Sequence, residues 1–158
     1  MGRENLQTNG FTLVEIVVVT SILGSLVLMA IPGLQRARVN ANHSSVISDL
    51  RTFRSANEMY RSQQSPPFFA PDVAALTAGN VPFLDTSWNT ANTLGRHSYT
   101  FTYIVDPSGA AYSMVAAPSN ANGINAYCVD QTSVISGGSD AGAPAGTAAG
   151  CTGGTPVT

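Results

Sequence analysis

The hydrophobic pattern of this chain is continuous at first, then periodic, and then alternating. Residues 16–34 carry no charge. At about 1.5 Å per residue, a helix of this length spans the roughly 30 Å core of a bilayer. From 35 to 61, apolar residues recur mostly at spacings of three, four and seven, with Arg54, Asn57 and Glu58 mostly off that stripe. The pattern predicts one helix over about 12–62, whose second half has one apolar face that needs a sheet to cover it.

Two prolines, Pro66 and Pro67, end this predicted helix. The connector that follows, 63–96, is too apolar for a free loop, so we expect it to lie over the core with Trp88 as a packing anchor. Within it, 72–76 predicts a short helix with Asp72 as the N-cap. On the helix surface, Arg54 and Glu58 are spaced to pair.

Alternating residues begin after His97. Tyr99, Phe101, Tyr103 and Val105 share one face of a predicted strand, which a turn at 106–109 joins to a second strand at 110–117. A turn at 118–123 leads to a third strand at 124–129, and a fourth short strand is possible at 132–135. The fold class is therefore α+β: one long N-terminal helix packed on an antiparallel sheet of three to four strands over 97–136. Residues 137–158 have too few large apolar side chains to order themselves.

Composition narrows the function classes. The chain has 158 residues and a net charge of −2, which does not favour nucleic acid or anionic lipid as a general partner. His43 and His97 stand alone, and Asp140 lacks a second oxygen-rich cluster beside it. The sequence therefore predicts no catalytic residue, no cofactor and no metal site.

The carboxylate of Glu15 is the exception at the start of the apolar run. An acid inside a membrane costs about 2.5–3.5 kcal/mol, so Glu15 needs a partner. A cation becomes available if the chain is cut after Gly10, because Phe11 then carries a free α-ammonium about one helical turn away.

The string Gly10, Phe11, Thr12, Leu13, Val14, Glu15, followed by the apolar run, resembles the signal of type IV pilins and type II secretion pseudopilins. The resemblance implies that a prepilin peptidase removes a leader, 1–10, between Gly10 and Phe11 and methylates Phe11. It implies that 11–34 forms the transmembrane and filament-core half of the helix, that 35–158 forms a globular pilin-like head, and that Glu15 pairs with a neighbouring copy during assembly.

Other readings of this segment remain open. The leader departs from the usual basic pattern, since Arg3 is offset by Glu4. The alternatives are an ordinary secretory signal peptide and an uncleaved single-pass anchor. Gly24 and Pro32 bracket a weak section of the helix, which the resemblance implies can extend on assembly; a simple kink is the alternative.

The two cysteines, Cys128 and Cys151, suggest one disulfide if the chain is exported, and two free thiols if it is cytosolic. In pilins a disulfide-bounded C-terminal loop is exposed on the filament, which implies this role for 128–151.

The first functional hypothesis is a subunit of a type IV pilus, with a type II secretion pseudopilin or minor pilin as the alternative. A membrane-tethered enzyme or sensor is a third. The expected partners are further copies in a helical filament, the prepilin peptidase/methyltransferase, the assembly machinery and the inner membrane. The expected location is the inner membrane for the precursor, then an extracellular filament or a periplasmic pseudopilus.

Overall fold

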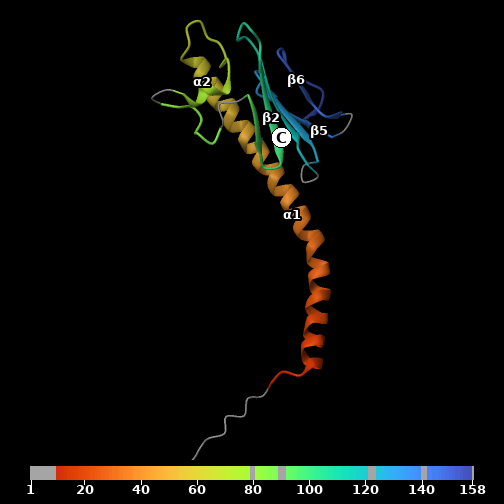
Figure 1. Cartoon of the computed structure of the whole chain (residues 1–158). Helices are drawn as coiled ribbons and strands as arrows, with labels where there is room; N and C mark the ends of the chain where they lie inside the picture. Colours follow the sequence, from red (N-terminus) through yellow and green to blue (C-terminus); the bar gives the residue numbers. More distant parts are fainter. Residues whose placement is uncertain (1–9, 79–80, 89–91, 121–123, 140–141, 158) are drawn as a thin grey trace, which may run out of the picture. The chain divides into compact units, whose positions relative to one another are not determined.

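The computed structural model describes residues 10–78, 81–88, 92–120, 124–139 and 142–157 (Figure 1). It divides into two compact units, Met1–Ala37 and Arg38–Thr158, which we describe separately. We call the described part of the second unit the head. Helix α1, Leu13–Ser62, contributes residues to both units and includes Pro32 without a break. The predicted helix is therefore confirmed to within one residue at its start.

The first unit consists of the apolar part of α1. Its large side chains are exposed, as the 82% exposure of Met29 and the 73% exposure of Leu28 illustrate. By length and composition, α1 is the one helix in the described part of the chain that could cross a membrane. Over residues 10–37, the described part of this unit, there is no other helix or strand over which to bury these side chains, so the surface is available to lipid or to other helices.

The head contains a six-stranded antiparallel sheet in the order β1-β2-β3-β4-β5-β8 and a two-stranded sheet, β6-β7. The α+β class is confirmed, with more strands than the three to four expected. The strands are β1 Thr93–Arg96, β2 Tyr99–Val105, β3 Tyr112–Pro118, β4 Ala126–Asp130, β5 Ile135–Gly138, β6 Ala145–Thr147, β7 Gly150–Thr152 and β8 Thr155–Pro156.

The core forms where the amphipathic part of α1 lies along one face of the sheet (Figure 1). As the periodicity predicted, Leu50 and Phe53 are fully buried on the helix side, and Tyr99, Phe101 and Tyr103 are buried on β2. Trp88 is buried against Phe53, with ring centroids 5.6 Å apart, which confirms it as a packing anchor. The short helix α2, Val73–Thr77, has Asp72 as its N-cap, as expected.

The sheet begins earlier than the alternation indicated. Strand β1 lies inside the segment expected to be a connector, and His97, expected to lie at a strand start, forms a two-residue turn with Ser98 instead. Both residues have positive φ, 51° for His97 and 65° for Ser98. Hairpin turns of this kind usually contain Asn or Gly, so His97 and Ser98 are not recognisable as a turn from their residue types, and β1 was not predicted.

The described part of the C-terminal segment, 137–139 and 142–157, is built into strands, which corrects the expectation for 137–158. Its backbone forms β6, β7 and β8, and the expected fourth strand lies at Ile135–Gly138 instead of 132–135. The disulfide Cys128–Cys151 joins β4 to β7 and confirms the cysteine pairing. The Asp130 carboxylate accepts a hydrogen bond from the Cys151 N–H at 2.9 Å, and the Ser113 hydroxyl donates to the Thr147 carbonyl at 2.8 Å. Polar contacts and the disulfide therefore replace the missing apolar side chains.

Two polar residues of α1 lie differently from the prediction. Asn57 is fully buried instead of off the apolar stripe, and its side chain accepts from the Ala70 N–H at 2.9 Å. Arg54 does not pair with Glu58: it donates to the Ser133 carbonyl at 3.1 Å, while Glu58 lies 3.8 Å from Arg61.

Candidate functional site

The start of α1 is closed by two residues that satisfy each other's hydrogen bonds. The Glu15 N–H donates to the Thr12 hydroxyl at 3.2 Å, and the Thr12 N–H donates to the Glu15 carboxylate at 3.3 Å. This is a capping box, in which a Thr and a Glu three residues later satisfy N–H groups that the helix leaves free at its start. Inside a bilayer such free groups would have no water to bind, so the cap matters more there.

The cap also fixes where the Glu15 carboxylate lies. Both contacts from Thr12, through its N–H and its hydroxyl, reach the same oxygen, Oε2. The other oxygen, Oε1, is left to accept from a second donor. The carboxylate lies in the first turn of α1, at the positive end of the helix dipole. Among the residues that the structure describes, Glu15 forms no ion pair.

The residues on either side of the expected cleavage point are open to solvent. Gly10 is exposed, and the Phe11 side chain is 81% exposed. Neither lies inside a helix, since α1 begins at Leu13. An exposed peptide bond outside a helix is accessible to a peptidase. The rest of the expected leader lies outside the described residues.

Thr12 is the residue of this site whose role the sequence reasoning missed. The signal was available, because a Thr followed three residues later by Glu, directly before an apolar run, is a helix-start pattern. The motif was interpreted only through Glu15 and its charge.

The hydroxyl groups inside the apolar run are satisfied within α1 itself. Thr20 donates to the Ile16 carbonyl at 2.9 Å, Ser21 to the Val17 carbonyl at 2.7 Å, and Ser25 to the Ile22 carbonyl at 2.8 Å. These side chains therefore add no unsatisfied polar group to the helix surface. Gly24 and Pro32 both lie within the unbroken α1, and a Cβ added at Gly24 would meet nothing within 4 Å.

The remaining candidates of the sequence have structural contacts. His43 packs edge-on to Tyr127, with ring centroids 5.0 Å apart. His97 does not stand alone: its Nε2 lies 3.4 Å from the Asp49 carboxylate, which Arg96 also approaches at 3.5 Å. Burial raises the pKa of the Asp49 carboxyl, and the charges of Arg96 and His97 oppose that rise.

The described residues contain no group of three or more His, Cys, Asp or Glu side chains that could hold a metal ion. Asp140, which the sequence left as a lone carboxylate, lies outside the described residues.

Comparison with known proteins found similarity over part of the chain. A type II secretion system core protein G of Pectobacterium carotovorum subsp. carotovorum is 37% identical over 60 residues, 38% of each chain. The protein of the same name from Klebsiella pneumoniae is 41% identical over 56 residues, 35% of this chain and 40% of the relative. That of Klebsiella michiganensis is 39% identical over 56 residues, 35% of this chain and 39% of the relative.

The chain thus spans about two fifths of the length of the curated relatives it matches. No family model matches the chain, and no solved structure matches it.

Proposed function

We propose that the chain is a structural subunit which assembles through its apolar helix. The premise is its similarity to the type IV pilin and type II secretion pseudopilin family. The precursor is held in the inner membrane, a prepilin peptidase cuts between Gly10 and Phe11, and the new Phe11 amine is methylated. Residues 11–34, which include the apolar half of α1, then leave the lipid and pack against the same segment of other copies, while 35–158 forms the globular, pilin-like part.

One observation carries this proposal: the divided role of the Glu15 carboxylate. Oε2 caps its own helix through Thr12, and Oε1 can accept from the Phe11 ammonium of an adjacent copy. A buried charge is costly when it is alone and tolerable when it is paired and hydrogen-bonded. Assembly supplies the pair, so each added subunit neutralises the charge of its neighbour and fixes its axial position.

The relatives favour a secretion assembly over a surface pilus. All three are named type II secretion system core protein G. We therefore propose a short pseudopilus in the periplasm, with the inner membrane and the secretion machinery as partners. This reverses the order of the two hypotheses that the sequence suggested.

A type IV pilus is the second candidate. The Cys128–Cys151 disulfide favours it, because the resemblance associates a disulfide-bounded C-terminal segment with pilins. Electron microscopy of cells that produce the chain from its own operon separates the two. Long surface fibres support the pilus, whereas secretion that fails without the chain, in cells lacking fibres, supports the pseudopilus.

The test of assembly compares two substitutions at one position. Glu15→Gln keeps an oxygen that can accept from Thr12 but removes the charge, whereas Glu15→Ala removes both. We expect both variants to be cut after Gly10 and to lose most of the sheared or cross-linked polymer, because a neutral amide cannot balance the Phe11 ammonium. Intact-mass measurement of the mature wild-type protein should give a chain that begins at methylated Phe11.

Two results would overturn the proposal. One is a mature protein that keeps its first ten residues. The other is a wild-type amount of polymer from Glu15→Ala. If Glu15→Gln assembles normally and Glu15→Ala does not, the carboxylate acts as a cap only and the charge-pairing role is wrong.

We also propose that α1 loosens between Gly24 and Pro32 when the subunit enters the polymer. Pro32 lacks the N–H that would continue the helical ladder, and Gly24 has the weakest helical preference of any residue except proline. The combined change Gly24→Ala and Pro32→Ala should stiffen the section and reduce the yield of polymer, without affecting cleavage. Unchanged yield would favour the simple kink.

A further inference from the structure

A groove at the edge of the head carries unpaired positive charge. It has a volume of about 360 Å³ and lies between α1 and the C-terminal edge of the sheet. Two arginines and several apolar residues line it, most of them exposed or half-buried and one, Ile135, buried, and no acidic side chain lines it. The residues that matter here are Arg51, Arg54, Val134, Ile135, Pro156 and Val157.

The positive charges of both arginines are available to bind an anionic group. Arg54 is held in place by its hydrogen bond to the Ser133 carbonyl, which is neutral, and Arg51 is exposed. Among the described residues neither forms an ion pair, whereas Arg61 and Arg96 each have a carboxylate partner. The groove therefore suits an anionic group flanked by apolar surface.

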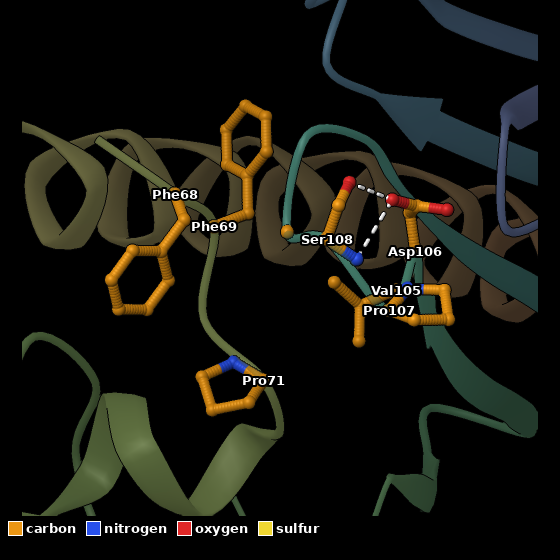
Figure 2. A pocket seen from close by; sticks show the side chains of 8 residues that line it. Phe68, Phe69, Pro71, Val105, Asp106, Pro107 and Ser108 are labelled. Atoms are coloured by element: carbon orange, nitrogen blue, oxygen red, sulfur yellow. Dashed lines mark hydrogen bonds between the residues drawn. The ribbon is translucent and has the colours of Figure 1, made fainter. Parts of the chain in front are cut away.

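The chain itself presents such a group on the turn between β2 and β3. Asp106 precedes the exposed Pro107, and its Oδ2 accepts hydrogen bonds from the N–H and the hydroxyl of Ser108 (Figure 2). Oδ1 is left for another donor. Among the described residues Asp106 forms no ion pair.

The other carboxylates of the described head are committed elsewhere. Asp49 and Glu58 contact arginines, Asp72 caps α2, Asp85 accepts a hydrogen bond from the Ser87 N–H, and Asp130 binds the Cys151 N–H.

The turn that carries Asp106 is rigid. The Gly109 N–H donates to the Asp106 carbonyl at 2.8 Å, and the Gly109 carbonyl accepts from the Phe69 N–H at 2.9 Å. Gly109 has a φ of 69°, and a Cβ there would lie 2.8 Å from Phe68. In Figure 2 the turn faces Phe68 and Pro71 across a hollow of about 340 Å³. A group held in its binding conformation loses little entropy when it docks.

The turn and the groove of one head do not contact each other. In the sheet order, β3 is two strand spacings from β5, roughly 10 Å, and three from β8, and none of the residues that line the groove belongs to the turn. Contact between them therefore requires a second copy, and it joins two different surfaces. Such head-to-tail contacts generate open helical polymers, which is the assembly proposed above. Strand β8 ends in Pro156, which limits backbone pairing at this edge and leaves side chains to make the contact.

We propose that the Asp106–Pro107 turn of one copy docks in the Arg51–Arg54 groove of the next. The carboxylate binds the two guanidinium groups, and Pro107 packs on Val134 and Pro156. The inference rests on the proposed function and adds to it the pair of surfaces by which the heads meet. A single such contact is weak, but it repeats along the polymer, where the apolar helices already hold the copies together.

The experiment uses the full chain in cells that carry the assembly machinery. Two alleles with different tags are expressed together, one with Arg51→Cys and one with Asp106→Cys, and the cells are oxidised. We expect a cross-linked species that contains both tags and is absent when either allele is expressed alone. The matched control replaces Asp106→Cys by Asp85→Cys, at an exposed carboxylate that is likewise held by a serine two residues later, and should give at least tenfold less product.

A charge exchange tests the same contact without new cysteines. Arg51→Asp and Asp106→Arg should each reduce polymer severalfold, and their combination in one chain should restore most of it. If the wild-type chain assembles while the mixed cysteine alleles give no product above the Asp85 control, the docking proposal is wrong and the proposed function stands. If the wild-type chain does not assemble at all, both fail. If Arg51→Cys instead cross-links to a different protein, another partner occupies the groove and the proposal is overturned.

Discussion

Asn57 is a polar residue at a fully buried position of α1, where its amide connects three elements. Its Oδ1 accepts from the Ala70 N–H, its Nδ2 donates to the Tyr103 hydroxyl at 3.2 Å, and that hydroxyl donates to the Ala70 carbonyl at 2.6 Å. The ring of contacts joins α1, β2 and the segment after the helix. Every partner is buried, so none can turn to water when one member is removed.

We expect Asn57→Ala to lower the free energy of unfolding by about 1–3 kcal/mol, because it leaves the buried Ala70 N–H without an acceptor and removes the donor to the Tyr103 hydroxyl, which keeps its own bond to the Ala70 carbonyl. Urea unfolding of the detergent-solubilised full chain, followed by Trp88 fluorescence, measures the change. Ser55→Ala, exposed on the same helix, is the control and should lie within about 0.5 kcal/mol of wild type. Equal midpoints for the two variants would contradict the role of the amide.

Thr12 allows a second test at a single residue. Thr12→Val keeps the shape of the side chain and removes the hydroxyl that accepts from the Glu15 N–H, whereas Thr12→Ser keeps it. We expect Thr12→Val to reduce polymer yield severalfold, since the cap also orients the Glu15 carboxylate. Thr12→Ser should retain most of the yield. The amount of sheared or cross-linked polymer per cell is the measurement, and equal loss in both variants would assign the effect to packing.

At the scale of single residues, an unusual charge could be recognised from the sequence more readily than a contact between distant side chains. Glu15 stood out because a lone acid in an apolar run is costly. Asn57 did not, because a polar residue beside a hydrophobic stripe is usually exposed, and only its partner 46 positions away in the chain makes its burial favourable. Local periodicity contains no information on such distant partners.

The helices and strands show the same difference between what local spacing predicts and what distant contacts decide. The 3.6-residue period predicted α1 and its buried face, and the two-residue period predicted the inward side chains of β2 and β3, since both depend on local spacing. Strand β1 and the C-terminal strands were not predicted, for two different reasons. The turn that joins strand β1 to β2 has no recognisable sequence signal, and the C-terminal strands are stabilised by hydrogen bonds, a disulfide and close backbone packing instead of apolar side chains.

The close packing of β6 on β3 can be tested by adding one methyl group. A Cβ at Gly146 would lie 2.5 Å from Val115 and 2.7 Å from the Ser113 hydroxyl, and neither short side chain can move far. We expect Gly146→Ala to lower the free energy of unfolding by about 1–3 kcal/mol. Gly95→Ala in β1 is the control, since a Cβ there meets nothing within 4 Å and should change stability little. If both variants unfold at the same urea concentration, β6 does not pack on β3 as described.

At the scale of the whole molecule, the two units differ in whether their large side chains are exposed or buried. The apolar part of α1 exposes its side chains, and the head buries a dense group of aromatic rings. Four of the five tyrosines, Tyr99, Tyr103, Tyr112 and Tyr127, are buried in that core. Burial raises the pKa of each of these four phenols above its usual value near 10.

The raised pKa values make alkaline pH a probe of the intact core. A phenol that ionises later in the folded than in the unfolded state contributes stability that is fully present below about pH 10 and declines as the pH rises further. We therefore expect tyrosinate absorbance at pH 10.5 to be less than half that of the same chain in denaturant, with the remainder appearing in one cooperative step as Trp88 fluorescence reports unfolding. Tyr103→Phe removes the buried phenol with the strongest hydrogen-bond network. Because that phenol ionises only on unfolding, the tyrosinate absorbance that appears before the unfolding step should be unchanged. Identical curves with and without denaturant would mean that these rings are accessible, and that the head does not have the core described.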